Sequence, residues 1–141
     1  MHLRSLYSRK IAVIVGSGEL PFEVISGIER LGVDYTVIVF EGVRSQSINK
    51  DKITYATFEN IAELLLELKK REFNSIICCG YMDRPRLDTV KLTDASKIIL
   101  EPIVNNLKFG DEKIFSSILK MFKEHKLEPI SLKEIIPNAF P

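Results

Sequence analysis

The sequence contains no tryptophan, only 2 histidines and only 2 cysteines. The cysteines, Cys78 and Cys79, are adjacent in an apolar run, where consecutive side chains point to opposite faces, so a disulfide between them would need unusual geometry. We interpret both as reduced thiols in the core. No metal-ligand spacing, Ser-His-Asp set or carboxylate pair can be assembled from the remaining residues. The residues alone therefore identify no catalytic centre.

An excess of charge of one sign is also absent, because 20 basic residues are interleaved with 19 acidic ones and the formal net charge is +1. This balance argues against nucleic acid as the main partner. No apolar run has the length of a signal peptide or of a membrane-spanning segment. We therefore expect a soluble, cytoplasmic protein.

The composition that remains is that of one globular domain, with 141 residues of which 45% are hydrophobic and 28% charged. Continuous apolar runs predict buried strands, and apolar residues at i, i+3 and i+4 predict helices between them. Strands are predicted at Lys10–Val15, Tyr35–Phe40, Ile53–Thr57, Ser75–Cys79 and Leu127–Ser131. Helices are predicted from Pro21 to Gly32, from Ile61 to about Arg71, from Thr93 to Lys108, after Gly110-Asp111, and from Leu132 to Ile136.

Two local signals refine the helices. Pro102 is expected to break or kink the third helix, because proline lacks the N–H that a helix interior requires. Asp111 is placed to cap the fourth helix. Strands that alternate with helices imply right-handed crossovers and a parallel sheet. We predict one three-layer, Rossmann-like α/β domain over residues 1–141, with a five-stranded parallel sheet in the order 3-2-1-4-5.

Ligands of such sheets bind outside the carboxyl ends of the strands, where the strand order reverses. Here that point lies between the first and fourth strands, and it gathers the loops Gly16–Pro21, Glu41-Gly42 and Gly80–Leu87. The first loop could hold an anion with backbone N–H groups at a helix start. Alternatively, its glycines serve only the tight turn from strand to helix.

A dinucleotide site is disfavoured at this turn, although Gly16 and Gly18 follow a strand and Glu41 ends the next one. Pro21 replaces the third glycine of that fingerprint and removes an N–H donor. Glu19 would place a carboxylate near the pyrophosphate, which costs Coulomb energy.

The loop after Gly80 contains Tyr81, Asp83, Arg84 and Pro85. Arginine can bind phosphate through two parallel hydrogen bonds, so Arg84 is a candidate anion ligand on a loop that Pro85 stiffens. An ion pair between Arg84 and Asp83, or with a domain partner, is the structural alternative.

Four motifs resemble one family in order and spacing. They are Ile-Val-Gly-Ser-Gly-Glu-Leu-Pro at 14–21, Phe-Glu-Gly at 40–42, Gly-Tyr-Met-Asp-Arg-Pro at 80–85 and Gly-Asp-Glu at 110–112. Together they cover nearly the whole chain and resemble the amino-terminal domain of the LpxI-type UDP-2,3-diacylglucosamine pyrophosphatases, formerly a domain of unknown function. Ser17, where the family more often has glycine, and the bulky Tyr81 depart from its pattern.

The resemblance implies a hydrolase of lipid A biosynthesis in Gram-negative bacteria, which cleaves UDP-2,3-diacylglucosamine to UMP and lipid X with magnesium or another divalent cation. It implies a partner in the carboxy-terminal half of the same enzyme, which carries the main catalytic acids and which we expect to be absent from this chain. We therefore predict no catalytic residue, no metal ligand and no cofactor for this domain alone. The ligand-binding residues that it implies, together with the loop positions above, are Gly16, Ser17, Gly18, Glu19, Leu20, Pro21, Glu41, Gly80, Tyr81, Arg84 and Pro85.

Two other functions remain open from the sequence. One is a free-standing module that binds a nucleotide or a phospholipid headgroup. The other is an interaction domain, with a homodimer as one form. A site at the inner face of the inner membrane, through peripheral contact without a transmembrane segment, is a further expectation.

Overall fold

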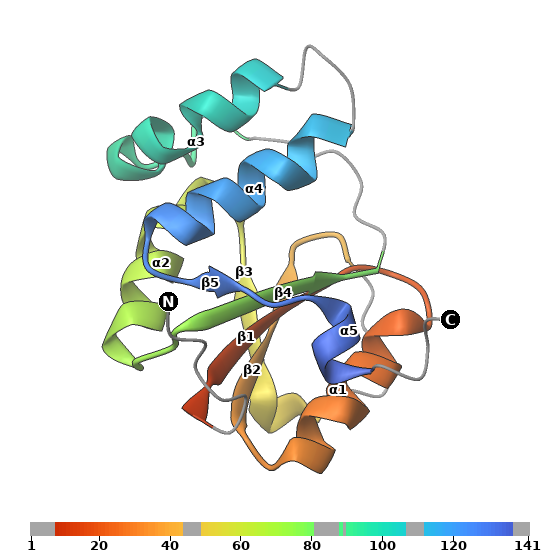
Figure 1. The fold of residues 1–141 in the computed structure, drawn as a ribbon. Coiled ribbons are helices and arrows are strands. Elements are labelled where there is room, and N and C mark those ends of the chain that lie inside the picture. The colour runs from red at the N-terminus through yellow and green to blue at the C-terminus, as the bar shows by residue number, and fades with distance from the viewer. Residues whose placement is uncertain (1–7, 44–48, 81–87, 89, 107–111, 137–141) are drawn as a thin grey trace.

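The structure is a computed structural model of the chain, and it describes residues 8–43, 49–80, 88, 90–106 and 112–136. Strands and helices alternate over most of this length (Figure 1). The strands are β1 (Lys10–Val15), β2 (Asp34–Phe40), β3 (Ile53–Ala56), β4 (Ser75–Cys79) and β5 (Glu128–Pro129). The helices are α1 (Leu20–Leu31), α2 (Ile61–Lys70), α3 (Asp94–Asn106), α4 (Glu112–Glu124) and α5 (Leu132–Ile135), with 3-10 turns η2 (Lys50–Lys52) and η3 (Phe58–Asn60). Only a 3-10 turn is described between β2 and β3, however, and α3 is followed by α4.

The five strands form one sheet in the order β3-β2-β1-β4-β5, and every neighbouring pair is parallel. β1 is central, with Val13 aligned to Val37 of β2 on one side and to Ile77 of β4 on the other. This order confirms the predicted α/β, Rossmann-like fold. Its point of reversal lies between β1 and β4, as expected from the sequence.

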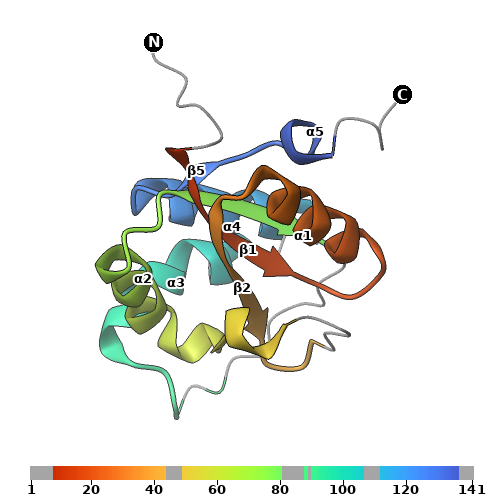
Figure 2. The same ribbon diagram turned by 90° about the horizontal axis from the view of Figure 1, so that it is seen from below.

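Each face of the sheet is covered by helices, as the turned view in Figure 2 shows. On one face, side chains such as Ala12, Ile38 and Ile76 pack against α2, α3 and α4. On the other, side chains such as Val13, Val37 and Ile77 pack against α1 and α5. Both faces of the central strands are therefore buried, which explains why their sequences are continuously apolar.

Two expectations from the sequence need correction. Pro102 does not break its helix, since α3 continues to Asn106, and a kink there stays a prediction. Ile98, whose carbonyl loses its N–H partner, is 73% exposed, so water can bond that carbonyl. The fifth strand is shorter than predicted, because Leu127 N donates to Phe122 O at the end of α4 and Ser131 caps α5. The proposed cap Asp111 lies outside the described residues.

An ion pair between a buried arginine and an exposed glutamate lies at the amino end of the sheet, far from the reversal point. Arg9 is 7% exposed, and its Nη1 donates to Glu128 Oε2 (2.8 Å) and to Ser75 Oγ (3.1 Å). It therefore ties the short β5 to β1 and β4. Its role is structural, because ligands of parallel sheets bind at the opposite, carboxyl edge.

Candidate functional site

Gly16 and Gly80 lie side by side at the carboxyl ends of β1 and β4. Gly16 N donates to Cys79 O (2.7 Å), so the β1–β4 pairing continues into the first residue of the loop. Gly80 has φ +91°, and a Cβ atom there would lie 2.9 Å from the Gly16 carbonyl carbon. Glycine is thus required at position 80 for both conformation and space. The two predicted loops leave the sheet in direct backbone contact.

The turn from Gly16 to Pro21 is built as a strand-to-helix connection with few free donors. Gly18 has φ +107°, and Glu19 precedes α1 without a side-chain cap hydrogen bond. Pro21 is buried in the first helical turn and has no N–H, while Phe22 N donates to Glu19 O (3.1 Å). Within this turn, backbone donors for a ligand must therefore come from the residues before Pro21. The positive φ of Gly18 explains a glycine in this turn, and it does not exclude ligand contact.

Exposure separates the residues of this turn. Ser17, Gly18 and Glu19 are exposed, whereas Gly16 and Pro21 are buried and Leu20 is half-buried. A ligand above the sheet would therefore meet Ser17, Gly18 and Glu19 first. In the loop after β4, Gly80 is half-buried and could contact the same ligand.

The remaining predicted site residues fall into two classes. Tyr81, Arg84 and Pro85 lie outside the described residues. Glu41 is exposed directly after β2, and its N–H donates to Ala56 O (3.0 Å) of β3. Glu41 and Gly16 therefore both follow the carboxyl end of a strand. The backbone of Glu41, however, is hydrogen-bonded to β3, on the side of β2 away from β1.

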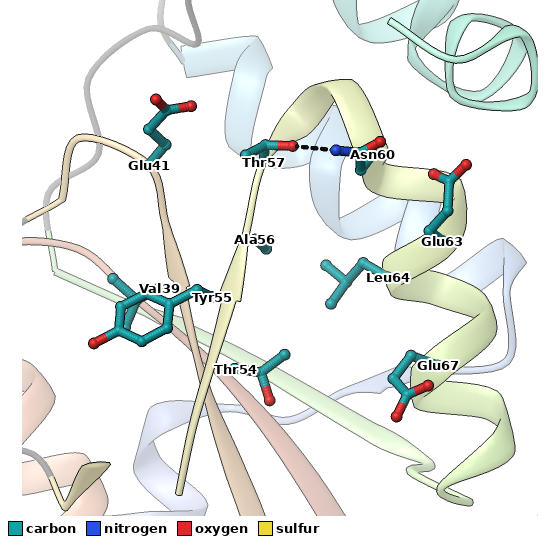
Figure 3. Close-up of a pocket in the computed structure, with 10 residues that line it drawn as sticks. All are labelled: Val39, Glu41, Thr54, Tyr55, Ala56, Thr57, Asn60, Glu63, Leu64 and Glu67. Carbon is teal, nitrogen blue, oxygen red and sulfur yellow. Dashed lines mark hydrogen bonds between the residues drawn. The ribbon is translucent and has the colours of Figure 1, made fainter. Parts of the chain in front are cut away.

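On that side Glu41 lines a hollow of about 500 Å³ between the edge strand β3 and α2 (Figure 3). Glu63 and Glu67 also line it, from the helix. The hollow was not predicted from the sequence. The available signal was the strand order, which places β3 at an open edge, together with the i, i+4 spacing of Glu63 and Glu67. The full lining is Val39, Glu41, Thr54, Tyr55, Ala56, Thr57, Asn60, Glu63, Leu64 and Glu67.

The two cysteines lie beside the reversal point but are poor nucleophiles. Both are free thiols on opposite faces of β4, Cys78 half-buried and Cys79 buried. Burial raises the pKa of the Cys79 thiol to about 12. The pKa of Cys78 is also raised to about 12, by burial and then by the charge of Cys79. Neutral thiols are weak nucleophiles and weak metal ligands.

The described residues gather no group of three or more His, Cys, Asp or Glu side chains that could hold a metal ion. We therefore assign no metal ligand in this part of the chain. Among the same residues, no helix is both long and apolar enough to cross a membrane.

A family model described as LpxI N-terminal domain matches residues 10–139. The chain belongs to this family. The match begins at the first residue of β1 and extends beyond α5, so it includes all the strands and helices named above. LpxI membership confirms the resemblance read from the sequence motifs and gives the chain the context of the lipid A pathway. The comparison with curated proteins found no match.

Proposed function

We propose that this domain binds UDP-2,3-diacylglucosamine as the amino-terminal part of an LpxI-type pyrophosphatase, which hydrolyses that substrate to UMP and lipid X. The observation that carries the proposal is the family match over residues 10–139. Support comes from the backbone contact between Gly16 and Gly80, which joins two motif loops at the sheet's reversal point.

The charges near the turn suggest how the ligand lies. Glu19 stands at the start of α1 and opposes an anion there by Coulomb repulsion. We place the phosphates toward Arg84 and the sugar hydroxyl groups toward Glu19, whose carboxylate can accept their hydrogen bonds. Ser17 and Gly18 are exposed beside Glu19 and would contact the same ligand.

In this proposal residues 1–141 alone bind UDP-2,3-diacylglucosamine but do not hydrolyse it, because the family's main catalytic acids belong to the carboxy-terminal half. The divalent cation implied for the full enzyme would act there. No step is assigned to it in this domain, since the described residues hold no cluster fitted to a metal.

Calorimetric titration with UDP-2,3-diacylglucosamine, UMP and NAD tests the binding step. We expect binding of the first two and none of NAD; NAD binding without UMP binding would overturn the proposal. Mixing the chain with the matching carboxy-terminal half tests the catalytic step. Release of UMP is expected only from the mixture. Ligand binding without activity in a folded complex would favour a free-standing binding module.

A further inference from the structure

The edge of β3 carries unpaired backbone groups. Glu41 N donates to Ala56 O, so Ala56 faces β2. Consecutive residues of a strand turn their N–H and C=O groups to opposite sides, so those of Tyr55 face away from the sheet. The same alternation turns the Ile53 carbonyl and the Thr57 N–H outward, and none of these groups has a hydrogen-bond partner among the described residues.

The opposite edge of the sheet is protected in a way that β3 is not. β5 has only two residues; Glu128 N donates to Asn74 O, just before β4, and Ile130 N donates to Ile76 O of β4. The residue between Glu128 and Ile130 that faces outward is Pro129, which has no N–H to offer a new strand. β3 has no proline, and Tyr55 at its middle is 72% exposed. The two edges therefore differ in their capacity to accept another strand.

Space for an added strand exists beside β3. The hollow of about 500 Å³ runs between β3 and α2, with Ala56 and Leu64 between the two elements (Figure 3). Tyr55 projects on the other side of β3, away from α2. A strand in this hollow would meet α2 with one set of alternate side chains and the Tyr55 ring with the other.

The charge of the hollow selects the occupant. Glu41, Glu63 and Glu67 are among its lining residues, and Glu63 Oε2 also accepts a hydrogen bond from Ser96 Oγ (3.3 Å). Arg71 reaches only the end near the start of β3, where its Nη1 donates to Thr54 Oγ1 (3.2 Å). A second copy of β3 would bring the same carboxylates against each other, which costs Coulomb energy. A segment with lysine or arginine side chains facing α2 is instead attracted to these glutamates.

We infer that β3 pairs with an extended, basic peptide segment of a protein partner, which adds a strand to the open edge of the sheet. Main-chain hydrogen bonds to Tyr55 and to the outward groups of Ile53 and Thr57 supply the affinity. The carboxylates of Glu63 and Glu67 select its basic side chains. This surface is separate from the ligand site proposed above, because it lies on the β3 side of Glu41 and not between β1 and β4.

Fluorescently labelled Lys-Val-Lys-Val-Lys-Val, blocked at both ends, is the probe, and anisotropy measures its binding to the chain. We expect binding that weakens with salt, with NMR shifts in the Tyr55 and Thr57 amides and none at Glu128. The corresponding glutamate peptide should not bind. Absence of binding, equal binding of both peptides, or self-association of the chain through β3 would overturn the inference.

Two N-methylated peptides test the backbone pairing without altering the protein. Methylation of one alternate set of residues removes the N–H groups that face β3, and methylation of the other set does not. One peptide should lose binding and the other should keep it; equal effects would overturn strand addition.

The charge selection is tested by Glu67→Lys, with Glu124→Lys on the exposed end of α4 as the matched control. Glu67→Lys should weaken binding of the lysine peptide by about threefold to fivefold, and Glu124→Lys should leave it unchanged. Equal affinities of the two variants would show that the hollow's charge does not select the partner.

Discussion

Gly80 packs directly on Ser17: a Cβ atom built on Gly80 would lie 2.8 Å from the Ser17 carbonyl oxygen. The start of the loop after β4 therefore packs on the loop after β1 through the backbone. Position 80 combines this close approach with φ +91°. Gly42 has nearly the same φ, +90°, but open space around it.

Alanine substitutions at Gly80 and Gly42 distinguish the cost of a strained φ from the cost of a backbone clash. Gly80→Ala should lower the free energy of unfolding by about 2–4 kcal/mol, since it adds a backbone clash to a strained φ. Gly42→Ala should cost only about 1 kcal/mol, from the strain alone. Urea denaturation of both variants measures the difference. Equal losses would mean that the contact between Gly80 and Ser17 does not constrain the loops.

The proposed ligand orientation gives Glu19 and Arg84 distinguishable roles. Glu19→Gln should weaken binding of UDP-2,3-diacylglucosamine several-fold, roughly 1 kcal/mol, but not binding of UMP, which has no glucosamine. Arg84→Ala should weaken both by about tenfold, because both contain phosphate. Calorimetry measures these affinities, and Arg30→Ala at the end of α1 is the control for loss of a positive charge. Stronger UMP binding by Glu19→Gln would place the phosphate at α1 instead.

Gly27 of α1 contacts α5, and this contact reverses the usual effect of alanine in a helix. A Cβ at position 27 would lie 2.8 Å from Ile135 Cγ2 and 2.9 Å from the Ile135 carbonyl oxygen. Elsewhere in a helix, glycine to alanine stabilises by about 0.5–1 kcal/mol. Here Gly27→Ala should destabilise by about 1–3 kcal/mol, because α5 must move away. Thermal unfolding checks the sign, and a raised melting temperature would contradict it.

Local patterns were sufficient for most of the fold. The apolar runs of β1 and β4 and the stripe Ile61, Leu64, Leu65 and Leu68 of α2 depend only on burial against the sheet, so periodicity identified them. Right-handed crossovers then limited the strand order. The end of β5 could not be read in this way, because it depends on the cap formed by Ser131.

The candidate site was predictable only in part. Strand order alone brings Gly16 and Gly80 together, so their proximity followed from the sequence. The contact of Gly80 with Ser17 did not, because it depends on how closely two backbones approach. The hollow beside β3 was also missed. It depends on the distance between α2 and the edge strand, which the polar residues Glu63 and Glu67 do not determine.

Ser96 of α3 caps a different helix. Its Oγ accepts a hydrogen bond from Ala62 N (3.0 Å) in the first turn of α2, where the N-cap residue Asn60 makes no side-chain cap. Ser96 is 0% exposed, and Thr93 Oγ1 donates to its Oγ (2.7 Å). Ser96→Ala should therefore lower the free energy of unfolding by about 1–2 kcal/mol.

Hydrogen exchange gives a more specific measurement of this cap. In Ser96→Ala the Ala62 amide should exchange faster than in the native chain. This increase should be larger than any increase at the amides of α1. Ser26→Ala, an exposed serine on α1, is the control and should leave both unchanged. A uniform change along the chain in Ser96→Ala would indicate general destabilisation and not the loss of a cap.

Burial of Cys79 makes the fold sensitive to alkaline pH. Its thiol has an ordinary pKa of 9.0, which burial raises to about 12, so the folded chain retains a proton that the unfolded chain loses. This difference in pKa stabilises the folded chain fully below pH 9, and the stabilisation is lost as the pH rises through about 12. Denaturation midpoints measured across this range should fall with pH. Cys79→Ala should be less stable at neutral pH but should show a flatter decline, because one thiol no longer titrates; parallel declines would contradict the assignment to Cys79.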